Sequence, residues 1–311
     1  MGKSKKFIIE NKGNTYYWPQ DSIINGLQEV LIFNENKTKN RIPNGSVFVY
    51  QKNTPYYPDI LNTDVGCGIT SFITNQLFPG NPQSDLNIKV EILKVVNELN
   101  IHIGQGNHFL DFTTGHPAFD QKGIETNMIF LHSDFNNRNI LPLNYDEAKD
   151  LQNIAKDKRI EFLDKLMKLL GVSGGFHHDW THNSIEIEDD SLVYRKGAIN
   201  LKKTDGVGAL ALNPFDGIIL YAGNFSDYRF SAQHGVGRKS SKGTFLKEFK
   251  KIKHGIARGY YVEYNTEHVF ELTRLCKQTY NSYDEFIDNY WLECSLIGSC
   301  VPEFVVTTKK K

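Results

Sequence analysis

The sequence predicts an α+β protein built as one compact domain. Short runs rich in β-branched and aromatic residues, separated by Asn and Gly, predict strands, and two longer segments carry apolar residues at helical spacing. The residues that suggest chemistry are spread over 64–238 without a low-complexity linker between them. A functional site must therefore be assembled within one domain, and 311 residues of which 40% are hydrophobic suffice for a sizeable core.

The first 60 residues predict strands and turns. Runs at 6–9, 30–33 and 46–50 have the composition of short strands, with Asn and Gly between them. After the third run, a loop that contains Pro55 and Pro58 leads into a glycine-rich turn. This turn carries the first of the candidate functional residues.

Two helices are predicted in the middle of the chain. The longer one covers 144–170, where Asn144 with Glu147 forms a capping-box pattern and Gly171 fits the C-terminal stop. The other covers 84–99 and is predicted from apolar residues at helical spacing. These residues are Ile88, Ile92, Val95, Val96 and Leu99.

The remaining elements are shorter. The apolar run at 128–132 predicts a buried strand that delivers His132 at its end. Residues 206–230 are apolar and rich in turn residues, which predicts strands. Basic residues dominate 242–253 and aromatic residues dominate 284–294, and both segments are predicted to be helical.

Charge and cysteine content limit the class of protein. The chain has 36 basic and 36 acidic residues, so it is no general polyanion-binding protein, although 238–258 holds eight Lys or Arg and one acidic residue, Glu248. The four cysteines include no Cys-x-x-Cys pair, which favours a reducing compartment. With no apolar run of membrane-spanning length and no signal-peptide pattern, we expect a cytoplasmic protein without membrane contact.

The segment from Asp64 to Gly68 is the first candidate metal-binding element. It places a carboxylate and the thiol of Cys67 three residues apart, with glycine on both sides of the thiol. Because glycine adopts backbone angles that other residues resist, a sharp turn could aim both side chains at one point. The spacing alone is a weak signal, since a lone Cys in a turn is more often a small buried hydrophobic residue.

Four downstream segments strengthen the prediction of a metal site at this turn. Each offers a histidine beside glycine or a small polar residue. Thiolate, imidazole and carboxylate ligands together suit transition metals. From ligand type alone, zinc is a reasonable candidate. The segments are Gly106-Asn107-His108-Phe109, His132-Ser133, His182-Asn183 and Gln233-His234-Gly235-Val236-Gly237-Arg238. His177 and His178 lie near this series but are more typical of surface or loop histidines.

In this order, the segments resemble the motifs of the RtcB family of RNA ligases. The resemblance runs from about residue 43 to 238 and implies an RtcB-type fold around a dinuclear manganese site. It implies that Cys67 bridges two Mn²⁺ ions, with two ligands on each side. Asp64 and His108 would complete one site and His132 and His182 the other. His234 would be the histidine that becomes covalently guanylylated by GTP.

The resemblance also assigns substrate contacts. Asn107 would bind phosphate, and Asp111 stands where the family has a glutamate that contacts the nucleotide. The glycines at 235 and 237 would let the backbone approach GTP, and the arginine that follows them would grip a phosphate. These residues are Gly235, Gly237 and Arg238. Arg195, Lys196 and the basic stretch at 238–258 would contact the RNA backbone.

Three segments depart from the family pattern. Asp134 follows His132-Ser133 where the family has a Ser-Gly-Ser-Arg-Gly segment, 212–217 does not match the family's Gly-Ser-Met-Gly-Thr, and Tyr194 replaces a histidine. We therefore keep two alternatives to a ligase. One is an enzyme that transfers nucleotides or modifies phosphate ends without joining them, and the other is a nucleic-acid-binding relative that has lost catalysis.

The resulting prediction is a single RtcB-like domain over 1–311. Residues 1–60 form an abbreviated N-terminal part, 61–240 the metal and guanylylation core, and 241–311 a basic and helical C-terminal part. The expected activity is GTP- and Mn²⁺-dependent joining of an RNA 3′-phosphate or 2′,3′-cyclic phosphate to a 5′-hydroxyl, through a His234–GMP intermediate. A helper protein is compatible with this interpretation.

Overall fold

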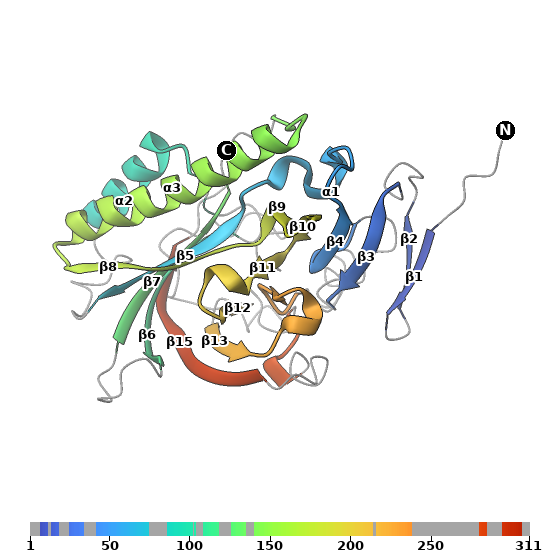
Figure 1. Ribbon diagram of the computed structural model, residues 1–311. Helices are drawn as coiled ribbons and strands as arrows, with labels where there is room; N and C mark the ends of the chain where they lie inside the picture. The colour runs from blue at the N-terminus through green and yellow to red at the C-terminus, as the bar shows by residue number, and fades with distance from the viewer. Residues whose placement is uncertain are drawn as a thin grey trace, which may run out of the picture.

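The structure is a computed structural model that describes most of the central part of the chain. The described residues are 7–11, 14–18, 25–33, 42–74, 86–101, 103, 108–117, 126–134, 140–213, 216–237, 280–284 and 294–306. Within them, strands outnumber helices, and the chain forms a compact mixed α+β structure (Figure 1). The predicted α+β class is confirmed at this level.

Strands dominate the order of elements along the chain. The strands are β1 (Phe7–Asn11), β2 (Asn14–Trp18), β3 (Leu27–Ile32), β4 (Ser46–Gln51), β5 (Gly68–Thr74), β6 (Phe109–Pro117), β7 (Thr126–Ser133), β8 (Gly174–Thr181), β9 (Asn183–Glu188), β10 (Ser191–Lys196), β11 (Ala198–Asn200), β12 (Val207–Asn213), β13 (Gly217–Gly223), β14 (Ser231–Gln233) and β15 (Cys294–Val306). The α-helices are α1 (Pro58–Leu61), α2 (Leu86–Glu98) and α3 (Tyr145–Leu170), and the 3₁₀-helices are η2 (Asn62–Asp64), η3 (Leu201–Lys203) and η4 (Ser226–Tyr228).

A seven-stranded sheet in the order β12-β13-β15-β6-β7-β5-β8 forms the centre of the fold, and its strands pair antiparallel. A four-stranded sheet, β3-β4-β10-β9, adjoins it through the short connection between β8 and β9. The pairs β1-β2 and β11-β14 make two small sheets. Strand β5, the second strand from one edge of this sheet, pairs with both β7 and β8, so the ends of these three strands lie side by side.

Helices α2 and α3 cover one face of this sheet (Figure 1). Strand β7 places alternate side chains on the two faces of the sheet, because successive side chains of a strand point in opposite directions. Ile129 and Leu131 pack against the helices, while Met128 and Phe130 pack in the cluster on the other face. This alternation places His132 on the face away from the helices.

The predicted helix 144–170 is confirmed with its caps. Asn144 lies in extended conformation before α3, and its side chain accepts a hydrogen bond of 2.9 Å from the backbone N–H of Glu147. Gly171 ends the helix in the left-handed conformation, with φ of 63°. The predicted helix at 84–99 corresponds to α2, and the predicted strands at 46–50 and 128–132 correspond to β4 and β7.

The C-terminal part differs from its prediction. Cys294, predicted to end a helix, instead begins β15, which lies between β13 and β6 within the central sheet. The register shifts between Pro302 and Phe304, which is consistent with a proline that cannot donate a ladder hydrogen bond. The description of 241–311 as a helical part is therefore wrong for 294–306, and the predicted helix at 242–253 lies outside the described residues.

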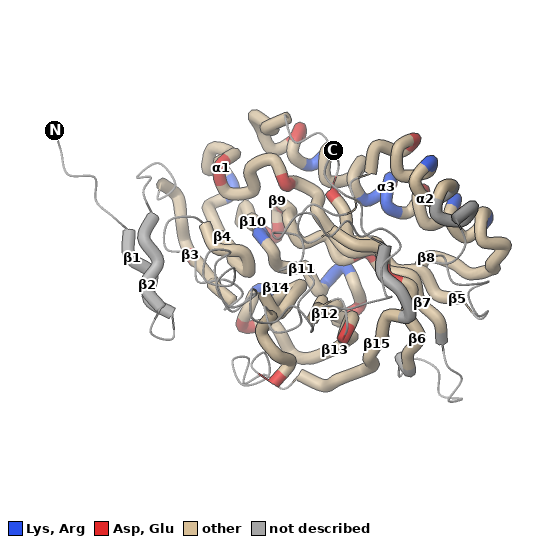
Figure 2. The backbone as a smooth tube through the Cα atoms, turned by 180° about the vertical axis from the view of Figure 1, so that it is seen from behind, with Lys and Arg blue, Asp and Glu red and all other residues tan. Residues whose placement is uncertain are grey.

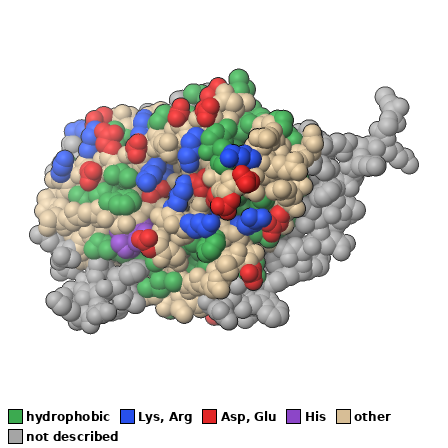
Figure 3. Space-filling view, in the orientation of Figure 1, with side chains coloured by type: hydrophobic (Ala, Val, Ile, Leu, Met, Phe, Trp, Pro, Cys, Tyr) green, Lys and Arg blue, Asp and Glu red, His purple; other side chains and the backbone are tan. Residues whose placement is uncertain are grey.

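None of the helices among the described residues combines the length and hydropathy needed to cross a membrane. Seen from behind, Lys and Arg recur along α3 (Figure 2). On the face drawn in Figure 3, Lys and Arg alternate with Asp and Glu instead of gathering into one basic patch.

Candidate metal centre

Three strand ends bring Cys67, His132 and His182 together. Cys67 directly precedes β5, His132 is the penultimate residue of β7, and His182 connects β8 to β9. In the sheet register, Ile69 lies opposite His132 and Gly68 lies opposite Thr181. The backbone N–H of His182 also donates a 2.9 Å hydrogen bond to the carbonyl oxygen of Cys67. Strand pairing therefore sets the positions of all three side chains.

The three side chains form a buried group of metal-ligating atoms. Sγ of Cys67 and one nitrogen of each histidine all lie within 4.8 Å of one another. Nε2 of His132 lies 3.4 Å from Sγ of Cys67 and 3.3 Å from Nε2 of His182. Two histidine nitrogens bound tetrahedrally to one zinc-sized ion lie about 3.3 Å apart, and a thiolate sulfur and a nitrogen lie about 3.5 Å apart. The residues therefore fit a metal ion.

The protonation of His182 suits this role. Its Nδ1 lies 3.3 Å from the carbonyl oxygen of Trp180, which can only accept, so Nδ1 carries the proton and the lone pair is on Nε2. Burial, together with the charges of His234, His132 and Arg159, lowers the pKa of His182 well below its ordinary value. A neutral imidazole is the form that binds metal.

His108 is a third histidine close to Cys67. Its Nε2 is 3.4 Å from Sγ of Cys67, and its Nδ1 is 3.8 Å from Oδ1 of Asp134. Carboxylates behind histidine ligands commonly fix the orientation of the ring. Sγ of Cys67 is thus equally close to His108 and His132, whose rings have centroids 5.2 Å apart, so the thiolate has more than one histidine within reach.

His234 lies against this group without belonging to it. Its ring stacks on that of His182 with centroids 3.8 Å apart and planes inclined by 19°. Nδ1 donates a 2.7 Å hydrogen bond to the carbonyl oxygen of Gly197, which leaves the lone pair on Nε2. Burial lowers the pKa of His234 to about 4, against a smaller opposite effect of the bond to Gly197. The imidazole is therefore neutral at physiological pH.

Asp64 is not brought into the group. Its side chain is exposed, and the described cluster of converging ligand atoms does not include its carboxylate. The backbone of Asp64 contributes instead, since its carbonyl oxygen accepts from the N–H of Cys67 and from the side chain of Asn183. The ligand role of Asp64 stays a prediction.

The predicted nucleotide-binding residues have different surroundings. Asp111 is buried on β6, where desolvation raises its pKa well above the ordinary value. Gly235 forms an isolated bridge with Ala211, and Gly237 adopts a φ of 70°. Asn107 and Arg238 lie outside the described residues. Their assigned contacts with GTP stay predictions.

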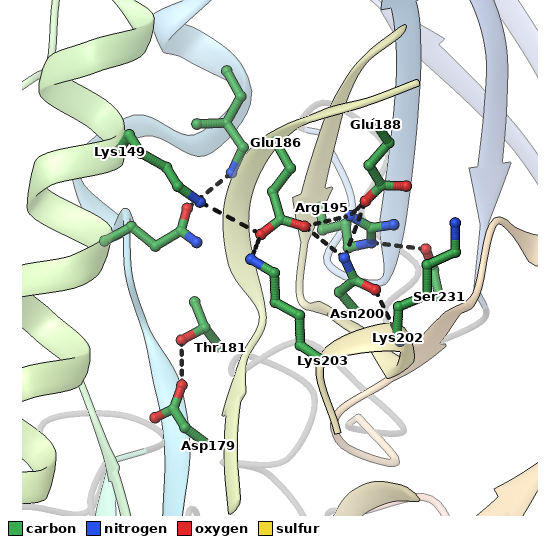
Figure 4. Close-up of polar contacts among 12 residues, drawn as sticks. Lys149, Asp179, Thr181, Glu186, Glu188, Arg195, Asn200, Lys202, Lys203 and Ser231 are labelled. Carbon is green, nitrogen blue, oxygen red and sulfur yellow. Dashed lines mark hydrogen bonds and ion pairs between the residues drawn. The ribbon is translucent and has the colours of Figure 1, made fainter. Parts of the chain in front are cut away.

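The RNA contact predicted for Arg195 is corrected. Arg195 is fully buried, and its guanidinium pairs with Glu188 at 2.5 Å and Glu186 at 3.3 Å (Figure 4). It also donates to the hydroxyl of Ser231. A phosphate cannot reach it, so Arg195 has a structural role. Lys196 is partly buried and donates to the carbonyl oxygen of Ile60 at 2.8 Å, and its RNA contact stays a prediction.

Two residues that the sequence analysis did not assign lie close to the ligands. Asp134 faces His108, and Arg159 of α3 contacts the segments that carry Cys67, His132 and His182. A signal for Arg159 exists in the sequence, because it occupies the apolar stripe of its helix. Ala155, Phe162 and Leu166 share that stripe and are buried.

No protein-family model matches this chain, and the search of curated proteins finds no match. The likeness to the RtcB family therefore rests on the motifs themselves.

Proposed function

We propose that this chain is a metal- and GTP-dependent RNA ligase of the RtcB type. It would join an RNA 3′-phosphate or 2′,3′-cyclic phosphate end to a 5′-hydroxyl end. One observation supports this most directly. The ring of His234 lies 3.8 Å from that of His182, which belongs to the buried group with Cys67 and His132. A candidate nucleophile thus adjoins a candidate metal centre.

Cys67, His132 and His182 would hold one metal ion, and His108, whose Nε2 is 3.4 Å from Sγ of Cys67, would contribute to a second. When bound, such ions neutralise the negative charge of phosphates. Manganese, and the count of two ions, come from the family resemblance. Sγ of Cys67 lies 3.4 Å from Nε2 of His108 and 3.4 Å from Nε2 of His132, which suits a bridging ligand.

His234 is the proposed nucleophile for GTP. Gly197 holds the proton on Nδ1, so the lone pair of Nε2 can form a bond to the α-phosphorus. The bond from that phosphorus to the β-phosphate oxygen breaks, and pyrophosphate leaves with the electron pair. An oxygen of the RNA 3′-phosphate then displaces His234 from the guanylyl phosphorus. Finally the 5′-hydroxyl attacks the 3′-phosphorus, loses its proton, and GMP leaves.

Asp134 supports a second candidate, an enzyme that modifies phosphate ends without joining them. Its side chain is 1% exposed and lies 3.8 Å from Nδ1 of His108. The family has no acidic residue at this place, and a buried negative charge here would disfavour a second phosphate close to the first. The metal cluster and His234 would serve both reactions.

A guanylylation assay tests the proposal. Incubation with α-labelled GTP and Mn²⁺ should attach one GMP to His234 through an acid-labile, base-stable phosphoramidate. His234→Ala should reduce labelling below detection while its metal content stays at the wild-type level. Cys67→Ala should lose the metal as well as the label, because no other thiolate lies in the cluster of described residues.

His177→Ala is the matched control, since this histidine lies on β8 outside the cluster. It should label like the wild type. An unlabelled wild type, or an adduct on His177, contradicts the proposed nucleophile. A labelled protein that does not join 3′-phosphate and 5′-hydroxyl RNA ends would favour the end-modifying enzyme.

A further inference from the structure

Arg159 reaches from the middle of α3 to the ligand-bearing strand ends. Its side chain is 1% exposed, although an arginine is among the residues least often buried. The guanidinium donates to the carbonyl oxygen of Gly66 at 2.6 Å and to that of Ser133 at 3.1 Å. It also donates to Oγ1 of Thr181 at 3.0 Å. One side chain thus bonds three separate segments.

Each of these three partners is next to a ligand of the candidate metal centre. Gly66 precedes Cys67, Ser133 follows His132, and Thr181 precedes His182. These three hydrogen bonds come from the side chain of Arg159, so they are additional to the backbone hydrogen bonds of the sheet. Two of them are accepted by backbone carbonyls and the third by a hydroxyl. The three ligands belong to three different strand ends, so a common anchor would fix their mutual spacing.

Asp179 holds the guanidinium in this orientation. Its Oδ2 accepts from Nη2 of Arg159 at 2.8 Å and from Nε at 3.2 Å, while the hydroxyls of Thr70 and Thr181 donate to the same carboxylate. Burial alone would raise the pKa of Asp179, but Arg159 and these hydrogen bonds outweigh it and lower the pKa. The carboxylate is ionised, and the charge of Arg159 is compensated.

The position of the Arg159 guanidinium also explains why the residue after Cys67, Gly68, has no side chain. A Cβ added to Gly68 would lie 2.5 Å from Nη2 and 2.8 Å from Cζ of Arg159, and 2.9 Å from Cα of Thr181. The guanidinium therefore packs directly against the backbone beside Cys67. Gly66 packs against helix α3 as well, since a Cβ added to Gly66 would lie 2.7 Å from the Cβ of Ala155.

We propose that Arg159 is a positioning residue that sets the spacing of Cys67, His132 and His182 for metal binding. Its planar fork offers five N–H donors in fixed directions, and two of its nitrogens donate to the three segments, whereas a lysine ammonium has all its donors on one nitrogen. This inference rests on the metal-binding part of the proposed function and is independent of guanylylation and RNA joining.

Cobalt titration of the full chain tests the inference, because a thiolate bound to Co²⁺ gives a charge-transfer band and the ligand-field bands report the geometry. Arg159→Lys keeps the positive charge beside Asp179 and removes the fork. We expect it to bind Co²⁺ roughly 10- to 100-fold more weakly than the wild type, the usual effect of losing a partner behind the ligands. The ligand-field bands should change as well.

Arg195→Lys is the matched control, since Arg195 is a second buried arginine paired with carboxylates but contacts no neighbour of the three ligands. It should keep the wild-type cobalt affinity and spectrum. Thr181→Val removes the hydroxyl that accepts from Arg159 and donates to Asp179, and it leaves the arginine in place. It should weaken Co²⁺ binding about 2- to 10-fold, as expected for the loss of one or two hydrogen bonds.

A wild-type affinity and spectrum in both Arg159→Lys and Thr181→Val would overturn the inference. An equal loss in Arg195→Lys would overturn it too, because the effect would then be a general loosening of the fold. A wild-type chain without a thiolate–cobalt band would overturn both the inference and the metal-binding part of the proposed function. An intact band in a chain that GTP does not label would contradict only the guanylylation.

Discussion

Arg159 and Arg195 are two buried arginines with similar surroundings and different consequences. Their side chains are 1% and 0% exposed, and each forms an ion pair with carboxylates. Arg159 donates to neighbours of the three candidate metal ligands, whereas Arg195 donates to residues that carry no ligand next to them. Burial and charge pairing alone therefore do not separate a residue that holds a site from one that holds the fold.

The Arg195 region joins parts of the chain that belong to different sheets. Arg195 lies on β10, Glu186 and Glu188 on β9, and Ser231 on β14. Figure 4 shows Glu186 facing Lys149 and Lys203 as well as the guanidinium. Asn200 donates to both glutamates and so connects β11 to the network. The network stabilises the junction between the four-stranded sheet and the β11-β14 pair.

The largest expected effect concerns the stability that Arg195 provides. Arg195→Met should lower the free energy of unfolding by about 3 kcal/mol or more, because Glu186 and Glu188 lose their buried counter-charge. Urea denaturation followed by circular dichroism measures this loss. Adding Glu188→Gln to the same chain should recover part of it.

A loss below about 1 kcal/mol would show that the lysines near Glu186 compensate for the missing guanidinium. In that case Arg195 would be less comparable to Arg159 than their burial suggests.

A second prediction concerns the space beside Arg159. Gly68→Ala would bring a methyl group within 2.5 Å of the guanidinium and 2.9 Å of the Thr181 backbone, so the loop or Arg159 must move. We expect a loss of about 1–3 kcal/mol in unfolding free energy and weaker Co²⁺ binding. Gly175→Ala on β8 is the control, because nothing lies within 4 Å of its added Cβ. Equal results for the two variants would contradict the proposed contact.

The sequence predicted elements whose signals are local. The helix 144–170 is found from its cap, its apolar stripe and Gly171, and the strand at 128–132 from an apolar run that is buried on both faces. The cluster of Cys67, His132 and His182 was expected from motif resemblance. Their convergence depends on strand pairing between residues far apart in the chain, which periodicity does not show.

The two arginines show where sequence reasoning fails. Arg195 was assigned to RNA because it follows a tyrosine and precedes a lysine in a motif-like segment, but its partner Glu186 becomes a neighbour only through the pairing of β10 with β9. Arg159 stood in the apolar stripe of a helix, and its partners come from three other segments. Similarly, β15 joins the central sheet from the far end of the chain.

The smallest expected effect concerns acid, which should weaken the Arg159 region through His177. This residue lies on β8 two positions before Asp179, its Nδ1 is 3.2 Å from the hydroxyl of Ser71, and its ring is 4.1 Å from that of His178. Burial, with a smaller effect from His178, lowers the pKa of His177 to about 4. Between that value and about 6.5, the unfolded chain binds a proton that the folded chain does not, so stability falls as the pH falls.

His177→Gln should remove part of this dependence. Above pH 6.5 His177 is neutral in both the folded and the unfolded wild type, and glutamine does not titrate. In this range the stabilities of the wild type and the variant should therefore change with pH in parallel. From pH 6.5 to 4 the wild type should lose about 1 kcal/mol more than the variant, a figure kept small because the side chain is only partly buried. Hydrogen exchange of β8 amides near Asp179 should accelerate first. Identical acid profiles for the two chains would show that folding does not change the pKa of His177 and that acid does not distinguish the two arginine regions through it.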